Sequence, residues 1–212
     1  MKILGVIPAR YASTRFPGKP LTMINGISMI ERVYRQATLA NSLSDVVVAT
    51  DDARILDHVH QFGGKAVMTS ANHPSGTDRC AEVLEKIPGA WDAVINIQGD
   101  EPYIQPEQID LLASCFQMED CKIATLVKLI DSESDLQNPN IPKVVVGIDG
   151  RALYFSRRPI PYFSDDKIAA ALAHESFFRH IGIYGYRSEV LMQLAKLNPA
   201  PLELAESLEQ LR

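Results

Sequence analysis

Cysteine is scarce in this sequence, and its spacing excludes some kinds of site. Three cysteines occur in 212 residues, at positions 80, 115 and 121. Their number is odd, and no two of them form a Cys-x-x-Cys pair. This pattern favours a reducing cytoplasm as the setting and disfavours a structural zinc site.

Long hydrophobic runs are also missing. No stretch approaches the roughly eighteen apolar residues of a membrane helix, and we expect no signal peptide before Ile3. The hydrophobic fraction of 46% and the charged fraction of 22% are ordinary for one globular domain. The formal net charge of -5 disfavours nucleic acid as a partner, because duplex binding requires a broad basic face.

Both common phosphate-binding motifs are absent. A P-loop requires Gly-x-x-x-x-Gly-Lys followed by Ser or Thr, whereas Gly18-Lys19 is followed by Pro20 and Ser13 stands in the place of the first glycine. The Rossmann pattern Gly-x-Gly-x-x-Gly does not occur. The sequence therefore argues against a typical ATPase or dehydrogenase, and any phosphate would be held mainly by charged side chains.

Positive charge does gather in one short segment. Arg10, Arg15 and Lys19 follow a predicted strand over residues 3–7, in a chain that is negative as a whole. Cations just beyond the first strand of a parallel sheet suit a polyphosphate, since arginine grips phosphate with two donors and lysine acts as a point charge. The alternative is a solvated loop with incidental basic residues. The residues Pro17, Gly18 and Pro20 favour a shaped loop instead.

Alternating strands and helices dominate the first two thirds of the chain. The hydrophobic pattern predicts strands over residues 3–7, 46–49, 65–68, 93–97 and 123–127. Helices are expected to begin near Ser28, at Asp51 or Asp52, at residue 77 and at Pro106. This order predicts an α/β fold with a doubly wound, mostly parallel sheet and right-handed crossovers.

The pattern changes after about residue 138. Residues 144–148 and 152–155 flank Asp149-Gly150 and predict a two-residue β-hairpin. An extended loop over 156–161 and a strand over 179–186 are expected to follow. We therefore predict a single domain over residues 1–212 with an inserted antiparallel β element at about 138–186.

A second polar motif, Gln98-Gly99-Asp100-Glu101-Pro102, directly follows the predicted strand 93–97. In a doubly wound sheet this loop opens into the same crevice as the basic loop. A carboxylate beside a polyphosphate is repulsive unless a divalent cation lies between them, so Asp100 implies a Mg²⁺ site. The alternative is an ordinary turn, but the meeting of two motifs at one edge favours the metal.

These residues carry a family resemblance that extends from Ile3 to Arg212. The first loop resembles the nucleotide-binding loop of the CMP-sugar-acid synthetases, and the chain is most similar to the 3-deoxy-manno-octulosonate (Kdo) cytidylyltransferase, or CMP-Kdo synthetase, family. Acylneuraminate synthetases typically have a Gly-Gly-Ser-Lys-type loop where this chain has Tyr11-Ala12-Ser13-Thr14-Arg15. The further motifs that carry the likeness are Ala49-Thr50-Asp51-Asp52, His73-Pro74-Ser75-Gly76-Thr77-Asp78-Arg79, Asn96-Ile97-Gln98-Gly99-Asp100-Glu101-Pro102, Leu153-Tyr154-Phe155-Ser156-Arg157, Arg179-His180-Ile181-Gly182-Ile183-Tyr184-Gly185-Tyr186 and Glu206-Ser207-Leu208-Glu209-Gln210-Leu211-Arg212.

The resemblance implies a nucleotide-diphospho-sugar transferase type of fold and the transfer of CMP from CTP to the anomeric hydroxyl of Kdo. Pyrophosphate would be released, and the activated sugar would serve lipopolysaccharide biosynthesis. The family also implies Mg²⁺ as cofactor and a homodimer as the assembly. The chemistry resembles phosphoryl transfer, for which metal and cations supply most of the catalysis, and no general base is identified.

The resemblance also implies roles for individual residues. Arg10, Arg15 and Lys19 would hold the triphosphate and act with Asp100, the metal ligand, in catalysis. Ala9, Ser75, Gly76 and Arg79 would line the cytidine pocket. The residues implied for the sugar acid are Gln98, Arg157, His180, Tyr184, Glu209 and Gln210. His180 has a second interpretation, because a lone histidine on a strand more often packs in a core.

One departure from the family pattern stands out. The pattern continues to a second metal-binding aspartate in a Gly-Val-Asp-type segment, which the 212 residues do not contain. Either the chain is a fragment of a longer protein, or that C-terminal segment is missing from the sequence.

Other functions remain open at this point. The substrate could be 8-amino-Kdo, which differs from Kdo at one distal substituent, and another alternative is an acylneuraminate. A glycosyltransferase of the same sheet type would usually carry Asp-x-Asp where this chain has Gln98-Gly99-Asp100. An inactive nucleotide-binding homologue is a further alternative, although it would have no physical need for the charge arrangement of Arg10, Arg15, Lys19 and Asp100.

Overall fold

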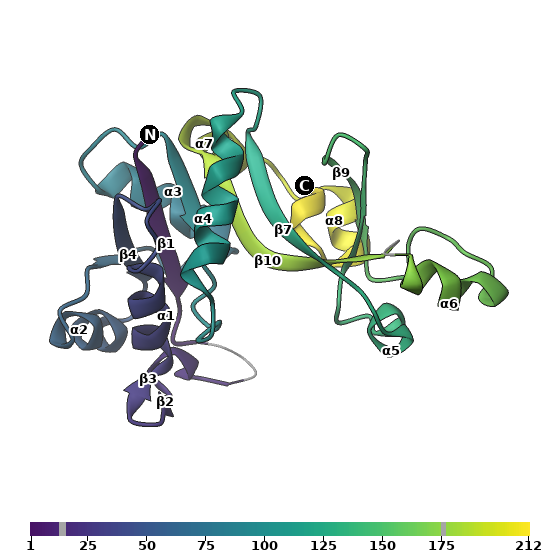
Figure 1. Cartoon of the computed structure of the whole chain (residues 1–212). Coiled ribbons are helices and arrows are strands. Elements are labelled where there is room, and N and C mark those ends of the chain that lie inside the picture. The colour runs from purple at the N-terminus through teal and green to yellow at the C-terminus, as the bar shows by residue number, and fades with distance from the viewer. Residues whose placement is uncertain (13–15, 175–176) are drawn as a thin grey trace. The chain divides into compact units, whose positions relative to one another are not determined.

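The computed structural model describes residues 1–12, 16–174 and 177–212. These residues form two compact units (Figure 1). The first unit comprises Met1–Ala124 and Ile183–Lys196, and the second comprises Thr125–Gly182 and Leu197–Arg212. No helix within the described ranges combines the length and the hydropathy that a membrane span needs.

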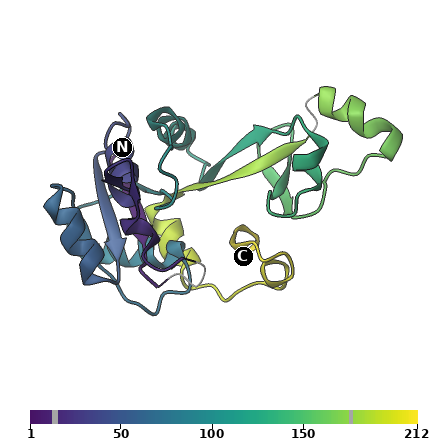
Figure 2. The same ribbon diagram turned by 90° about the horizontal axis from the view of Figure 1, so that it is seen from below.

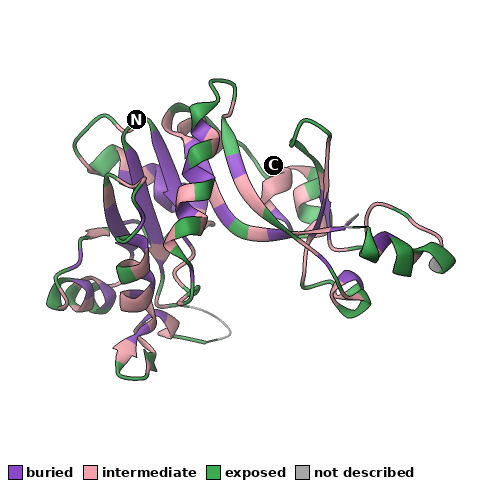
Figure 3. Cartoon of the chain, viewed as in Figure 1, coloured by how far each residue is buried: buried purple, intermediate pink, exposed green. Residues whose placement is uncertain are grey.

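The first unit is built on parallel strands in the order β5-β4-β1-β6. β10 then pairs with β6 in the antiparallel sense. All four residues of β6 are buried, as are six of the seven residues of β1 (Figure 3), because helices cover both faces of the sheet. The strands are β1 (Ile3–Ala9), β4 (Asp45–Thr50), β5 (Ala66–Met68), β6 (Ala93–Asn96) and β10 (Phe178–Arg187).

Helices of the first unit start at side chains that cap them. The side chains of Ser28, Asp52 and Ser75 each accept a hydrogen bond from a backbone N–H in the first turn of the following helix. α3 and α7 pack on one face of the sheet, and α1 and α4 lie on the other (Figure 1, Figure 2). The remaining elements of this unit are α1 (Met29–Ala37), α2 (Ala53–Gln61), α3 (Gly76–Lys86), α4 (Pro106–Ser114), α7 (Ser188–Leu194), the 3-10 turns η1 (Lys19–Leu21) and η2 (Cys115–Gln117), and the small hairpin β2 (Met23–Ile24) and β3 (Ile27–Ser28).

The second unit is antiparallel. β8 pairs with β9 and with the start of β10, and a register shift lies between Val145 and Val146. Two small apolar clusters hold it together, one around Leu136 and Phe177 and one around Val144 and Leu208. Its elements are β7 (Ile123–Leu129), whose first two residues belong to the first unit, β8 (Lys143–Val146), β9 (Ala152–Ser156), α5 (Glu133–Gln137), α6 (Asp165–Ala173), α8 (Pro201–Glu206) and η3 (Glu209–Leu211).

The predicted fold class is confirmed, with corrections after residue 130. The strand expected over 179–186 inside the insert is β10, and its second half pairs with β6 of the first unit. The helices α5, α6 and α8 were not predicted. The hairpin strand expected to reach Ile148 ends at Val146. Val146 pairs with Ala152, and the Gly147 N–H donates to the Arg151 carbonyl, so residues 147–151 form the turn in place of the predicted two-residue turn. The chain divides into two compact units by its contacts. Whether it is a single domain with an insert at 138–186, as the sequence predicts, is not tested by this division and stays a prediction.

Candidate active site

Three parallel strands end beside one another and form the edge at which the site is built. Ala9 of β1 pairs with Thr50 of β4, and Val6 of β1 pairs with Asn96 of β6. Loops that leave such an edge share one crevice. The carboxyl edge therefore receives the first loop, the segment after β4 and the loop after β6.

Glycines shape two of these loops. Gly18 has a φ of 71°, and a Cβ there would lie 3.1 Å from the Tyr11 ring, so this position requires glycine. The Gly18 N–H donates to the Tyr11 carbonyl at 2.9 Å, which brings together the two ends of the first loop. A Cβ on Gly99 would lie 2.6 Å from the carbonyl oxygen of Pro8. Only glycine therefore lets the loop after β6 lie against the end of β1.

This close approach brings the basic loop and the acidic loop together. Lys19 Nζ donates to Asp100 Oδ2 at 2.6 Å, although the two residues are 81 positions apart. Both side chains are partly exposed, 36% for Lys19 and 51% for Asp100, so the pair adds little stability and can exchange partners. Arg10 is exposed directly after β1, and Arg15 lies outside the described residues. The sequence predicts that the two motifs meet at this edge, and the contact of Lys19 with Asp100 joins them there.

The donor set at this edge suits Mg²⁺. Asp100 offers an accessible carboxylate, and Mg²⁺ binds through one or two carboxylates while phosphates and water complete its shell. No cluster of three or more His, Cys, Asp or Glu residues occurs in the described part of the chain. A Mg²⁺ ion on Asp100 would therefore take most of its ligands from a nucleotide, which is the arrangement that the sequence predicts.

The segment implied for cytidine starts α3. Ser75 Oγ accepts the N–H of Asp78 at 3.2 Å and donates to Asp78 Oδ2 at 2.6 Å, which fixes the first turn. Gly76 is the first residue of the helix and presents its backbone at the edge of the sheet. The end of a helix at which free N–H groups gather favours an anionic or acceptor-rich ligand.

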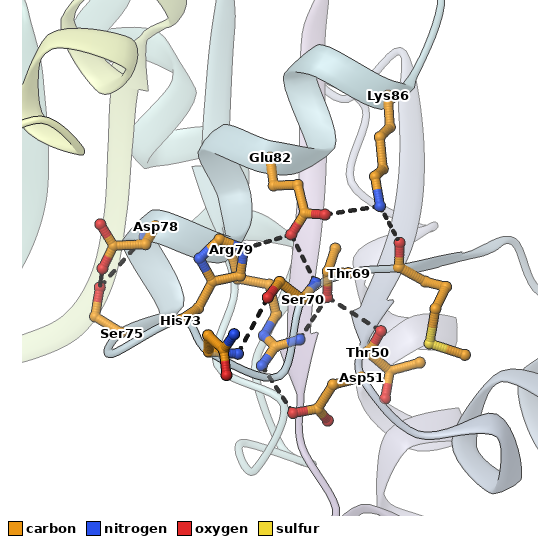
Figure 4. Close-up of polar contacts among 12 residues, drawn as sticks. Thr50, Asp51, Thr69, Ser70, His73, Ser75, Asp78, Arg79, Glu82 and Lys86 are labelled. Carbon is orange, nitrogen blue, oxygen red and sulfur yellow. Dashed lines mark hydrogen bonds and ion pairs between the residues drawn. The ribbon is translucent and has the colours of Figure 1, made fainter.

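Arg79 is buried in the same segment and held by two partners (Figure 4). Its side chain is 5% exposed. The guanidinium donates to Thr69 Oγ1 and, at 3.1 Å, to Asp51 Oδ2. Thr69 Oγ1 in turn donates to the Thr50 carbonyl at 3.1 Å. Arg79 therefore ties α3 to the ends of β4 and β5.

Glu82, one turn further along α3, collects donors from the loop before it (Figure 4). Its carboxylate accepts the Ser70 N–H at 2.8 Å, a hydrogen bond from His73 Nε2, and the Lys86 ammonium at 2.7 Å. Burial alone would raise the pKa of Glu82, but Lys86, the Ser70 N–H and His73 together lower it to about 2. Glu82 therefore fixes the loop that leads into Ser75. In the sequence only the i,i+4 spacing to Lys86 indicates a partner for Glu82, because Ser70 and His73 reach it from the preceding loop.

Two residues implied for the sugar acid belong to the first unit. Gln98 is half-buried directly after β6. Tyr184 lies opposite Asn96 in the β10–β6 pairing, and its ring stacks on Tyr186 with 6.1 Å between the centroids. Gln98 and Tyr184 thus both lie beside the end of β6.

The other four residues implied for the sugar acid, Arg157, His180, Glu209 and Gln210, belong to the second unit. Arg157 has a structural role there. Its guanidinium donates to three backbone carbonyls, those of Pro139, Glu206 and Ser207, at 2.8–3.0 Å. The Glu206 carboxylate accepts the Arg157 N–H at 2.9 Å and the Ser156 hydroxyl at 2.6 Å. Arg157 and Glu206 therefore fasten the C-terminal segment to β9. Contact between Arg157 and a sugar carboxylate stays a prediction.

His180 packs inside the second unit. It is 8% exposed, its Nε2 lies 2.8 Å from Thr125 Oγ1, and its ring meets Phe155 edge-on. Burial lowers the pKa of His180 to about 4, so the ring is neutral at pH 7. This geometry favours the core interpretation of His180, and its contact with a sugar stays a prediction.

Glu209 and Gln210 lie in η3, directly after the segment that Arg157 holds. Both are half-buried. Glu209 Oε1 is buried and has no hydrogen-bond partner within the described ranges. A buried acceptor of this kind requires a donor, and a ligand hydroxyl is one way to supply it.

The comparisons with known proteins agree with this geometry. The family model described as cytidylyltransferase matches residues 4–212. The chain is 54% identical to the 3-deoxy-manno-octulosonate cytidylyltransferases of Cytophaga hutchinsonii and of Parabacteroides distasonis, and it covers 85% of the length of each with all of its own residues. It is 44% identical to the CMP:2-keto-3-deoxy-manno-octonic acid synthetase whose structure was solved in complex with CTP. That match has a TM-score of 0.91 and covers 100% of this chain and 84% of the other.

The match extends through both units and takes in the basic loop, the loop after β6 and the start of α3. Identity near one half over the whole chain is far above what a shared fold alone produces. The chain belongs to the cytidylyltransferase family.

Proposed function

We propose that this protein transfers CMP from CTP to the anomeric hydroxyl of 3-deoxy-D-manno-octulosonate and releases pyrophosphate. The observation that carries the proposal is the 2.6 Å contact between Lys19 and Asp100, which joins the two polar motifs at the carboxyl edge of a parallel sheet. The high identity to relatives named for this reaction supports the choice of substrates. The product would be an activated sugar acid for lipopolysaccharide biosynthesis.

The nucleotide is assigned to the first unit. Arg10, Arg15 and Lys19 would neutralise the triphosphate, and their charge would stabilise the negative charge that develops on the leaving pyrophosphate. Ala9, Ser75, Gly76 and Arg79 would surround the cytidine, with backbone groups of Ala9 and Gly76 making close contacts at the sheet edge.

Asp100 would hold Mg²⁺, which supplies charge neutralisation at the phosphates when bound. The Lys19 ammonium would then leave Asp100 and bind phosphate oxygens. Its ion pair with Asp100 is partly exposed and therefore easily broken. Because cations and positioning lower the barrier in such transfers, the proposal needs no residue in the role of a strong base.

The side chains that the family resemblance implies for the sugar acid are polar. Gln98, Tyr184, Glu209 and Gln210 offer paired donors and acceptors for hydroxyl groups. The unpartnered Oε1 of Glu209 supports its place in this group. Arg157 would act by holding the Glu206–Ser207 segment, and a direct contact with the sugar carboxylate is a second possible role for it.

We also propose a cytoplasmic homodimer. Cys115 and Cys121 are free thiols, which fits a reducing compartment. Ile148 and Leu153, in the β8–β9 hairpin, are exposed apolar side chains. The family resemblance implies a homodimer, and this antiparallel element is where we propose the contact with the second copy. Equilibrium sedimentation tests the assembly, and a monomer at micromolar concentration would contradict it.

A pyrophosphate-release assay tests the proposed reaction. Purified protein with Mg²⁺ and CTP is offered Kdo, 8-amino-Kdo or N-acetylneuraminate, and UTP replaces CTP in a parallel series. We expect turnover that needs both CTP and Kdo. Preference for 8-amino-Kdo or the neuraminate would move the substrate to that sugar acid, and no release with any acceptor would favour an inactive nucleotide-binding homologue.

A further inference from the structure

Asn96 is a buried polar residue in the middle of the first unit, and the known motifs give it no role. It ends β6 after Ala93, Val94 and Ile95, and it is 3% exposed. Its Oδ1 is buried without a hydrogen-bond partner among the residues that the structure describes.

Such an oxygen weakens the folded state. A buried acceptor gives up its hydrogen bonds to water and here gains none in return. An apolar side chain would fit the apolar sequence of β6 without this loss. Unpaired polar groups of this kind are often kept in native proteins for function rather than for stability.

The surroundings of Asn96 point to its partner. Asn96 Nδ2 lies 3.5 Å from the position that a Cβ on Gly76 would occupy, so the amide lies beside the first residue of α3. Across the sheet, Asn96 is paired directly with Tyr184 of β10, and paired residues project to the same face. Asn96 therefore lies between the segment assigned to cytidine and a residue assigned to the sugar acid.

We propose that Asn96 is a substrate-binding residue whose Oδ1 accepts a hydrogen bond from a substrate hydroxyl. The inference rests on the proposed function and adds a residue to it. A hydroxyl suits this place because Oδ1 can only accept, whereas phosphate oxygens have no proton to give at neutral pH. The ribose of CTP and the sugar acid both carry hydroxyl groups. Separate KM values for CTP and for Kdo distinguish these two sources.

The test compares Asn96→Leu and Asn96→Ala with the wild-type protein. Thermal melting reports stability, and KM values for CTP and for Kdo report binding. We expect Tm to stay the same or to rise in Asn96→Leu, because the orphaned oxygen is gone. KM for one substrate should rise about tenfold in both variants, which is the usual value of one neutral hydrogen bond. A rise confined to CTP places the donor on the nucleotide, and the same measurement with 2′-deoxy-CTP then tests a ribose hydroxyl. A rise confined to Kdo places the donor on the sugar acid.

Ser188→Ala is the matched control. Ser188 Oγ is also buried without a partner in the described ranges, but its backbone N–H donates to the Asp92 carbonyl, before the other end of β6. Removing its hydroxyl should leave Tm and both KM values unchanged or raise Tm slightly.

Three results decide the matter. Unchanged KM values in an active Asn96→Leu protein would refute the role of Asn96 and leave the proposed function intact. A KM rise that comes with a lower Tm in both variants would also refute it, because general disruption would explain both changes. If the wild-type protein released no pyrophosphate, the proposed reaction would fail, and calorimetric Kd values for CTP and Kdo would still show whether Asn96→Leu weakens binding.

Discussion

Replacing Glu82 by glutamine should destabilise the protein in a way that depends on pH. The carboxylate accepts the Ser70 N–H, His73 Nε2 and the Lys86 ammonium, and glutamine keeps the size but removes the charge. One of its amide N–H groups would face one of those donors. The loop before Ser75 would therefore lose its attachment to α3.

The magnitude follows from the pKa of Glu82. A fall from the usual 4.5 to about 2 corresponds to about 3 kcal/mol, since a tenfold change in proton affinity is worth about 1.4 kcal/mol. The side chain is 15% exposed, so solvent screens little of this value. The folded pKa is depressed, so the contribution is complete at pH 7 and is lost as the pH falls below 4.5 towards 2.

Urea unfolding of wild type and Glu82→Gln at pH 7 and at pH 3.5 measures this effect. We expect a loss of about 2–3 kcal/mol at pH 7, and a loss about 1 kcal/mol smaller at pH 3.5. Glu85→Gln removes the same charge from an exposed position of the same helix and should change stability by less than about 0.5 kcal/mol. A loss that is the same at both pH values, or no larger than that of Glu85→Gln, would refute the reasoning.

The remaining predictions concern the two polar motifs and the second unit. Lys19→Ala should lower kcat about a hundredfold or more with Tm unchanged, and near-normal steady-state turnover would remove Lys19 from the site. Arg15→Ala should behave in the same way in that assay. Asp100→Asn should abolish Mg²⁺-dependent pyrophosphate release while circular-dichroism melting stays within a few degrees of wild type, and a large fall in Tm would indicate a structural turn instead. Glu206→Gln should lower the free energy of unfolding by about 1–2 kcal/mol at pH 7 in urea unfolding. The Ser156 hydroxyl and the Arg157 N–H donate to different oxygens of the carboxylate, and glutamine keeps one acceptor oxygen and no charge. The pKa of Glu206 is lowered, chiefly by the Arg157 N–H, so this difference should shrink as the pH falls below the usual value, and a constant difference would contradict the assignment.

Local chemistry made much of the first unit predictable. The apolar run of β4 is visible in the sequence as a short buried strand. The capping side chains of Ser28, Asp52 and Ser75 bond to backbone N–H groups two or three residues further on, so the local sequence indicates them as well. The meeting of Lys19 with Asp100 was predictable as well, because the carboxyl ends of parallel strands share one edge.

The parts that were missed depend on partners far away in the chain. β10 carries a strand pattern, but nothing in it specifies that β6 is its neighbour. From the sequence, Arg157 is expected to offer its charge to a ligand. In the fold its guanidinium donates to backbone carbonyls about 18 and 50 residues away in the chain. Glu82 reads as an ordinary surface helix position until the loop at Ser70 folds onto it.

Transfer of label from CTP tests the central claim most directly. The protein is incubated with Mg²⁺, Kdo and CTP labelled at the α-phosphorus, and the products are separated and identified by mass. The account predicts that the label appears in a CMP–Kdo conjugate while the pyrophosphate released is unlabelled. Label that stayed in CTP, or appeared only in free CMP or CDP with Kdo unchanged, would contradict it.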